Sequence, residues 1–252
     1  MDNISSRKNA YIAHVRALAA DGDYRRERGE YLCDGVKTLR EAVRFGAEVI
    51  SVLWKEEPQD IEGLCCAAQY TAPAELFDYA SVMKNSPGPL FTVRMPRERD
   101  GGHIKNAIVL ENVQDPGNVG TVIRSANAFR IGAVILTGSC ADLYNPKTVR
   151  ATMGAIFRQR VFALDMDSLR AVLGENGLML YGAALSENAQ DIRSIPVSNA
   201  AVAVGSEGRG LSREFLAMCG GEVIIPMNED SESLNAGAAA SVIMWEMARG
   251  SI

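Results

Sequence analysis

The chain has 252 residues, of which 47% are hydrophobic and 23% are charged, a balance that excludes an intrinsically disordered protein. Its 26 Lys and Arg against 31 Asp and Glu give a net charge of −5, which argues against a protein that is basic throughout. A local cluster of cations can still bind phosphates. The five cysteines have no C-x-x-C spacing, and no apolar run reaches the roughly 18 residues of a membrane span. These properties predict a cytoplasmic protein.

The first hundred residues predict a small α/β unit. Apolar residues recur at helical spacing in residues 8–20, and a strand follows at residues 30–34. A second amphipathic helix contains Val36, Leu39 and Val43, and residues 48–54 form a further buried strand. Residues 85–106 combine proline, glycine and mixed charge without any period. We therefore predict two domains, residues 1–98 and 99–252.

The second half alternates apolar strands with helices. The strands are expected at AIVLE (residues 107–111), VILT, LMLYGAAL, AVAVG and EVIIP, and the last helix runs from residue 234 to about residue 249. This alternation predicts a parallel sheet covered on both faces. Open sheets of this kind bind ligands beyond the carboxyl ends of their strands, so the loops there are the candidate site.

The first such loop follows residues 107–111 and contains the turn Asp115-Pro116-Gly117. Asn118 is expected to be the N-cap of the next helix. In that helix Arg124 lies about 160° from the centre of the apolar stripe, so its side chain is displayed. On this segment alone a solvated arginine is the favoured interpretation.

The second loop, GSEGRG at residues 205–210, follows an apolar strand and precedes a helix. Its G-x-x-G-x-G order differs from the dinucleotide fingerprint, and no G-K-[ST] follows, which argues against a nucleotide triphosphate site. Glu207 places a carboxylate beside backbone N–H groups that a ligand can use. A tight strand-to-helix turn is an equally good interpretation.

The third loop leads from Pro226 into the last helix. Ser233 is expected to cap this helix. Small residues, Ala236, Gly237 and Ala240, allow another helix or another subunit to approach closely. The only histidines, His14 and His103, are near no Ser or Cys motif, and no cluster has the spacing of metal ligands. The loops therefore favour chemistry that depends on positioning a substrate and a cofactor.

Taken together, the loops resemble the three motifs of the SpoU (TrmH) family of RNA ribose 2′-O-methyltransferases, in the SPOUT superfamily. The first motif is Asn118-Val119-Gly120 with Arg124, the second is residues 205–210, and the third is Ile225-Pro226-Met227 with Ser233-Leu234-Asn235. The segment NPKTVRATMGA at residues 145–155 is similar to the family's P-K-x-x-R-A-S-x-G-A pattern, with Thr152 in place of Ser. Gly237 stands where many relatives carry Ser.

The resemblance covers nearly the whole chain and implies its architecture. An α/β catalytic domain with a parallel sheet and a trefoil knot would follow a small, ribosomal-protein-like α/β domain that binds RNA. The family resemblance also implies a homodimer, S-adenosylmethionine as the methyl donor and S-adenosylhomocysteine as the product, with no metal, DNA or membrane involved.

Site residues are carried over from the same motifs. Arg124 is expected to anchor a phosphate and orient the 2′-OH, because a guanidinium stays protonated and is therefore a poor base. A role for Arg124 as the base stays a hypothesis. The other expected catalytic residues are Asn118, Glu207, Ser233 and Asn235. The cofactor loops are expected to contribute Thr137, Gly138, Val204, Gly205, Glu207, Gly208, Gly210, Ile225, Met227, Ser233 and Leu234. The expected RNA-binding cations are Arg25, Arg26, Arg28, Lys37, Lys147 and Arg150, although clusters of this kind are usually solvated faces.

The expected reaction is methylation of a ribose 2′-OH in structured RNA, the group that distinguishes RNA from DNA. In its length and its N-terminal domain the chain resembles the ribosomal-RNA members of the family more than the minimal transfer-RNA members, so the resemblance implies large-subunit ribosomal RNA as the substrate. Two alternatives within the fold are a transfer-RNA 2′-O-methyltransferase and a catalytically silent RNA-binding protein. A non-RNA cofactor enzyme is disfavoured, because the dinucleotide fingerprint is absent.

Overall fold

A computed structural model describes residues 1–83, 85–96, 102–228 and 233–249. The chain divides into two compact units, Met1–Glu98 with Asp142–Arg158, and Arg99–Ala141 with Gln159–Ile252. The predicted boundary between residues 98 and 99 lies outside the described residues and stays a prediction. The structure adds that a segment from the middle of the chain belongs to the first unit.

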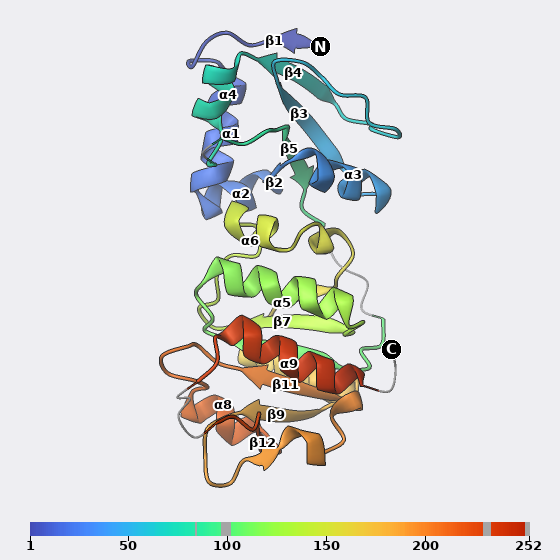
Figure 1. Cartoon of the computed structure of the whole chain (residues 1–252), viewed down its shortest axis with the longest axis vertical. Helices are drawn as coiled ribbons and strands as arrows, with labels where there is room; N and C mark the ends of the chain where they lie inside the picture. Colours follow the sequence, from blue (N-terminus) through green and yellow to red (C-terminus); the bar gives the residue numbers. More distant parts are fainter. Residues whose placement is uncertain (84, 97–101, 229–232, 250–252) are drawn as a thin grey trace. The chain divides into compact units, whose positions relative to one another are not determined.

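The first unit contains a mixed five-stranded sheet (Figure 1). Its strands, in spatial order, are β1 (Asp2–Asn3), β4 (Ala68–Ala72), β3 (Val49–Lys55), β5 (Leu90–Arg94) and β2 (Glu30–Asp34). β5 is antiparallel to both of its neighbours, whereas the other described pairs are parallel. The helices are α1 (Ala10–Ala20), α2 (Gly22–Arg28), α3 (Val36–Arg44) and α4 (Ala74–Ala80). The predicted strand at residues 30–34 and the helices at residues 8–20 and after Val36 are therefore confirmed.

The short helix α2 was not predicted, because its sequence, GDYRRER, has no apolar stripe. It forms because the side chain of Asp21 accepts hydrogen bonds from the backbone N–H groups of Asp23 and Tyr24. Gly29, in the left-handed conformation, ends it after two turns.

The segment 142–158 adds α6 (Pro146–Ala151) and the 3₁₀ turn η1 (Ala155–Phe157) to the first unit. Its buried Val149 and Ile156 pack in one hydrophobic cluster with Leu39 of α3 and Trp54 of β3. This shared core explains why the segment belongs to the first unit although its neighbours in sequence belong to the second.

The second unit contains a seven-stranded sheet in which every described strand pair is parallel. This confirms the predicted α/β class and the parallel C-terminal sheet, while the knot stays an expectation from the resemblance. The strands, in spatial order, are β10 (Gln190–Asp191), β12 (Gly221–Ile224), β9 (Met179–Ala183), β11 (Ala200–Val204), β6 (Ala107–Glu111), β7 (Ala133–Thr137) and β8 (Val161–Ala163).

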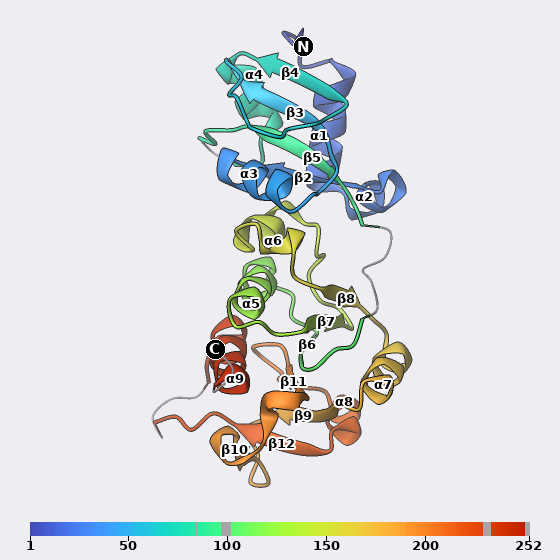
Figure 2. The ribbon, with the colours of Figure 1, turned by 90° about the vertical axis from the view of Figure 1, so that its right-hand side faces the viewer.

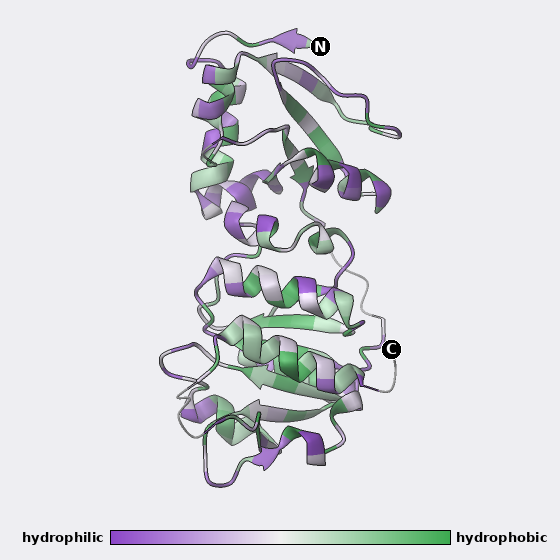
Figure 3. Cartoon of the chain, viewed as in Figure 1, coloured by the Kyte–Doolittle hydropathy of each residue, from purple (hydrophilic) through white to green (hydrophobic). Residues whose placement is uncertain are grey.

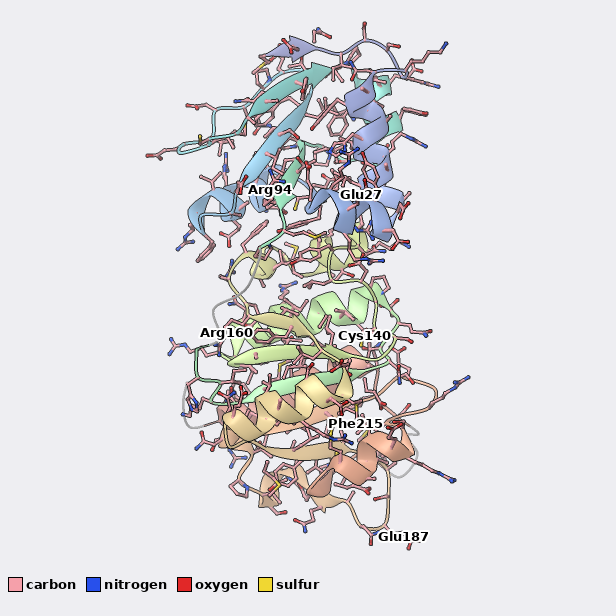
Figure 4. All side chains as sticks on the ribbon, turned by 180° about the vertical axis from the view of Figure 1, so that it is seen from behind. Glu27, Arg94, Cys140, Arg160, Glu187 and Phe215 are labelled. Atoms are coloured by element: carbon pink, nitrogen blue, oxygen red, sulfur yellow. The ribbon has the colours of Figure 1, made fainter. Side chains whose placement is uncertain are left out.

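Helices cover both faces of this sheet, as Figure 2 shows. One face carries α5 (Pro116–Ala128) and α9 (Ala236–Ala248), and the other carries α7 (Met166–Glu175) and α8 (Arg213–Met218). Two further 3₁₀ turns, η2 (Ile192–Ser194) and η3 (Val197–Asn199), precede β11. The central strands β6, β7 and β11 are mainly hydrophobic in Figure 3, as expected for strands buried on both sides of the sheet. Phe215 of α8, labelled in Figure 4, is fully buried in the core.

Both predicted N-caps were wrong. Asp115 caps α5 by accepting from the backbone N–H of Asn118, so Asn118 already lies in the first turn. Asn235, not Ser233, caps α9, because its side-chain oxygen accepts from two backbone N–H groups of the helix. In each case the true cap is a neighbouring Asp or Asn that the sequence offered equally well. None of the described helices has both the length and the apolar character of a membrane span.

Candidate active site

Three loops of the second unit leave the carboxyl ends of neighbouring strands. β6 and β11 are adjacent in the sheet, and β9 separates β11 from β12. The loops after β6, β11 and β12 therefore lie at one edge, where parallel sheets bind ligands. These are the three loops that the sequence analysis selected.

The side chain of Glu207 joins these loops. Its Oε1 accepts a hydrogen bond from the side-chain amide of Asn118 in α5 and another, at 3.2 Å, from the amide of Asn235. One residue from each of the three predicted motifs thus meets at a single carboxylate. Hydrogen bonds to an ionised acceptor are stronger than neutral ones, so this cluster fixes the loops relative to one another.

Helix starts hold both asparagines in place. The backbone N–H of Asn118 bonds to the carboxylate of Asp115, and the side-chain oxygen of Asn235 accepts from Gly237 and Ala238 while its amide faces Glu207. A Cβ on Gly237 would lie 3.1 Å from Oδ1 of Asn118 and 3.2 Å from Oδ1 of Asn235. The absence of a side chain at Gly237 therefore lets the first turn of α9 lie close to Asn118.

The Gly-rich loop after β11 folds back on itself. The backbone N–H of Gly210 donates to the carbonyl of Ser206 at 2.8 Å, and Gly210 has a φ of +65°. A Cβ on Gly205 would lie 2.1 Å from the carbonyl carbon of Gly210, so only glycine fits there. The close approach of the backbone therefore requires glycine at position 205, and the positive φ favours glycine at position 210.

Glu111 anchors the far end of the same loop, and the sequence analysis did not select it. This carboxylate, at the end of β6, is buried and accepts from the backbone N–H of Ser212 at 2.8 Å and from its hydroxyl at 2.6 Å. Ser212 in turn caps α8. A carboxylate that ends an otherwise apolar buried strand is the signal that would have identified Glu111.

A pocket of about 540 Å³ lies between the ends of β9, β11 and β12. Its volume is within the range for small-molecule sites, about 300–1,000 Å³. Two carboxylates, those of Glu207 and Glu222, are in its described lining, and Ser186 donates to Oε2 of Glu222 at 2.5 Å. The apolar part of the lining is formed mainly by Leu211, Leu216, Ile225, Met227 and Leu234. The apolar walls suit a nucleobase, and the carboxylates suit a positive charge. Together with the backbone of the loop at residues 205–210, they fit a cationic nucleoside ligand.

Most of the predicted cofactor residues meet at this pocket, but Thr137 and Gly138 are absent from its described lining. Thr137 is buried at the end of β7, and its hydroxyl has no hydrogen-bond partner among the described residues. Gly138, with a φ of +65°, lies against the side chain of Asn112. The predicted residues that do line the pocket are Val204, Gly205, Glu207, Gly208, Gly210, Ile225, Met227, Ser233 and Leu234.

Arg124 is exposed on α5, as its helical position predicted. It forms no hydrogen bond or ion pair with the described residues. A charged guanidinium six residues after Asn118 is thus presented to solvent, and an anionic ligand can reach it.

The predicted RNA-binding cations differ in exposure. Arg25 is only 3% exposed, and its guanidinium is occupied by Asp142 and by the carbonyl of Leu18, so the structure does not present it to a ligand. The other five side chains, those of Arg26, Arg28, Lys37, Lys147 and Arg150, are exposed. Among the described residues there is no group of three or more His, Cys, Asp or Glu placed to hold a metal ion.

Both cysteines near the site remain thiols. Burial raises the pKa of Cys219 to about 11, with the charges of Glu222 and Glu111 adding to the effect. Burial also raises the pKa of Cys140. Since the thiolate is the nucleophilic form of cysteine, neither residue is activated for covalent catalysis.

Comparisons with known proteins identify relatives of the whole chain. Residues 105–245 match the model of the SpoU rRNA Methylase family. The chain is 29% identical to the 23S rRNA (guanosine(2553)-2′-O)-methyltransferase RlmP of Bacillus subtilis, over 98% of this chain and 99% of that protein. It is 27% identical to the 23S rRNA (uridine(2479)-2′-O)-methyltransferase of Streptomyces viridochromogenes, over 96% and 90%.

A solved structure shows the same likeness. The SpoU methyltransferase AviRb of Streptomyces viridochromogenes, in complex with the cofactor AdoMet, superimposes with a TM-score of 0.85 at 25% identity. The match covers 96% of this chain and 98% of that one.

Proposed function

The chain belongs to the SpoU rRNA methylase family of RNA ribose 2′-O-methyltransferases, and from this membership we propose that it transfers a methyl group from S-adenosylmethionine to a ribose 2′-OH of large-subunit ribosomal RNA. The observation that carries the proposal is the cluster of Asn118, Glu207 and Asn235 beside the 540 Å³ pocket. Ribosomal RNA as the substrate is supported by two relatives of nearly full length that are named as 23S rRNA methyltransferases. With ribosomal RNA as its substrate, the protein would act in the cytoplasm.

We infer that the pocket holds the cofactor. Leu211, Ile225 and Leu234 offer an apolar slot for a nucleobase, and the carboxylates of Glu207 and Glu222 favour a cationic ligand. S-adenosylmethionine supplies an electrophilic methyl group on a sulfonium when it is bound. The loop after β11 presents backbone groups to the ligand and tolerates no Cβ at Gly205, which is consistent with recognition by main chain.

Arg124 is assigned to the RNA. A ribose 2′-OH is a poor nucleophile, so it must lie in line with the methyl group and lose its proton as it attacks. A guanidinium binds a phosphate in bidentate fashion and can orient the neighbouring hydroxyl. The exposed Arg124, free of ion pairs with described residues, is suited to this role. Asn118 and Asn235 hold Glu207 so that the loop between the pocket and the RNA stays in position.

The exposed apolar face of α9 supports a homodimer. Val242 and Trp245 are 43% and 55% exposed on a helix whose other face, with Ile243 and Met247, is buried. The ring centroids of Trp245 and Phe129 are 5.6 Å apart, with the rings edge to face. A helix that is apolar on all sides is normally covered, and a second copy of the chain would cover it. Trp245→Glu should give a monomer in light scattering, whereas Val82→Glu, at a residue 54% exposed in the first unit, should not.

The experiment that tests the function is tritiated methyl transfer to ribosomal and transfer RNA pools, followed by mapping of alkali-resistant 2′-O-methyl sites. Arg124→Lys should lower transfer by about 100-fold, because lysine cannot reproduce bidentate contact. Binding of S-adenosylhomocysteine, measured by calorimetry, should be unchanged. Arg170→Lys on α7, at an exposed arginine paired with Asp167, is the matched control.

Three results would revise the proposal. Label that appears mainly in transfer RNA would favour the transfer-RNA enzyme. Cofactor binding without label on any RNA, including assembling ribosomal particles, would favour a silent RNA-binding protein. Near-normal turnover by Arg124→Lys would remove Arg124 from the mechanism.

A further inference from the structure

One face of α3 carries a row of cations. Lys37, Arg40 and Arg44 are all exposed, and at 100° per residue they lie within about 60° of one another. The buried residues of the helix, Leu39 and Ala42, lie on the opposite side. Lys37 and Arg40 form no ion pair with any residue that the structure describes. The hydrophilic face of α3 can be followed in Figure 3.

An exposed aromatic ring stands at the end of this row. Phe45 follows the last residue of α3 and is 39% exposed. Two guanidinium groups lie over its ring: that of Arg158 at 4.6 Å and that of Arg44 at 5.4 Å from the ring centroid. Arg158 comes from the segment 142–158, which belongs to the same compact unit. Sequence neighbours and a distant segment thus build one surface.

The charge of this surface is positive although the chain is acidic. Glu41 is the one described carboxylate paired on it, bonding to Arg158 and, at 3.8 Å, to Arg44. These five described side chains, Lys37, Arg40, Arg44 and Arg158 against Glu41, together carry a surplus of three positive charges. The side chain of Arg44 is 73% exposed, so its guanidinium can shift on the ring to stack on a base without a large loss.

A similar arrangement around Tyr79 lacks this surplus. Arg7 and Arg16 lie over the Tyr79 ring at 4.8 and 4.1 Å. However, α4 also carries Glu75, which pairs with Arg7, and Asp78, which pairs with Lys55. Tyr79 is also partly buried, whereas Phe45 is exposed. The cations there are largely neutralised, so the comparison singles out the Phe45 surface.

We propose that Phe45, Arg44 and Arg158 form a stacking platform for an unpaired base of the RNA substrate, while Lys37 and Arg40 bind the phosphates beside it. This inference rests on the proposed function, which supplies RNA as the ligand. Unpaired bases stack on aromatic rings and on guanidinium planes, and cations along a groove follow the backbone. The platform accepts a single-stranded or looped segment and not a continuous duplex, because paired bases are already stacked.

The test uses the full chain and fluorescence anisotropy with a labelled single-stranded oligoadenylate over a range of salt concentrations. Phe45→Leu should weaken binding about tenfold, because stacking on the ring is lost. The slope of log affinity against log salt should stay the same, since no phosphate contact is removed. Phe45→Trp should bind about as tightly as the wild-type chain, because it keeps an aromatic ring. If Phe45→Leu bound weakly only because the position tolerates no change, Phe45→Trp would bind weakly as well.

Removing a cation that binds a phosphate should change the salt dependence of binding, unlike Phe45→Leu. Arg40→Ala, which removes a cation assigned to the phosphates, should weaken binding and also reduce the salt slope by about 0.7, the value for one phosphate contact on a single strand. Arg170→Ala, at an arginine 53% exposed on α7, is the charge-matched control and should change neither quantity. A duplex of the same length should bind equally to the wild-type chain and to Phe45→Leu.

Wild-type affinity in Phe45→Leu, or a parallel loss on duplex and single strand, would overturn the platform. The two proposals fail separately. If the wild-type chain methylates RNA but Phe45→Leu binds normally, only the platform is wrong. If no RNA is methylated but binding of the oligoadenylate depends on Phe45, only the proposed function is wrong.

Discussion

Asn118 and Asn235 donate their side-chain amides to the same atom, Oε1 of Glu207, although they come from opposite ends of the second unit's sequence. Each asparagine belongs to the start of a helix, Asn118 to the first turn of α5 and Asn235 to the N-cap of α9. Because a shared acceptor couples its donors, moving one helix start displaces the carboxylate that the other one holds.

Replacement of Asn235 can separate its two roles. Asn235→Ser should keep the cap of α9 and lose the bond to Glu207, because a serine hydroxyl satisfies the helix N–H groups but does not reach as far. Asn235→Ala should lose both and cost about 1 kcal/mol in the free energy of unfolding. Both variants should lower methyl transfer by at least about tenfold, the value of a hydrogen bond to a charged group. Full activity in Asn235→Ser, measured beside urea unfolding, would show that the bond to Glu207 is dispensable.

Gly205 should not tolerate a side chain. Gly205→Ala would place a Cβ 2.1 Å from the backbone of Gly210, so the loop after β11 must open. We expect a clear fall in melting temperature and loss of S-adenosylhomocysteine binding in calorimetry. Gly174→Ala, in α7 with nothing within 4 Å of the new Cβ, should instead stabilise the chain by about 0.5–1 kcal/mol. Cofactor binding by Gly205→Ala at wild-type strength would contradict the assignment of this loop.

The sequence predicted those features that depend on period and on local turn residues. The strands at residues 30–34 and 107–111 were located to the residue, and the three loops were selected because they follow apolar strands. The family motifs alone placed Asn118, Glu207 and Asn235 in one site, since no periodic pattern relates them, and the hydrogen bonds between them were not predicted. Long-range packing was not foreseen: Val149 and Ile156 bring residues 142–158 into the first unit, and Arg25 is buried there. Cationic character alone could not distinguish this structural arginine from the exposed Arg26 next to it.

The burial of Arg25 makes it a stability residue. Its guanidinium bonds to Oδ2 of Asp142 at 2.5 and 3.1 Å and to the carbonyl of Leu18 at 2.6 Å. Arg25→Met would leave Asp142 without its partner, and breaking a buried pair costs about 3–5 kcal/mol. We expect a loss near the lower limit, about 3 kcal/mol, because the Asp142 side chain is 30% exposed.

Arg26→Met is the matched control for that experiment. The Arg26 side chain is 66% exposed, and its one ion pair with a described residue is to Asp23, one turn earlier in α2, so its loss should cost no more than about 0.5 kcal/mol. Urea unfolding of both variants compares the two arginines directly. Equal and small losses would mean that the pair between Arg25 and Asp142 contributes little to the first unit.

Asp34, at the end of β2, should make the folded chain less stable as pH rises above about 4, which is the opposite of the usual effect of a carboxylate. Burial raises the pKa of this carboxyl above 3.8, although a hydrogen bond from Ser86 and the charge of Arg150 partly oppose the effect. Its Oδ2 is buried and has no partner among the described residues. The folded chain therefore binds the proton more tightly than the unfolded chain, and the cost of the charged form develops as pH rises from 3.8 through the raised pKa.

Asp34→Asn removes this titration. The melting temperature of the variant minus that of the wild type should rise as pH increases from about 4 and should level off above the folded-state pKa. Asp165→Asn is a control with the opposite sign, because hydrogen bonds from Ser168 lower the pKa of Asp165 and its stabilising charge is lost as pH falls. Its difference should therefore become more negative as pH rises towards about 4, and should be nearly level at the higher pH values where the Asp34→Asn difference rises. A flat difference for Asp34→Asn across this range would show that the carboxyl is solvated in the folded chain and that burial does not control its ionisation.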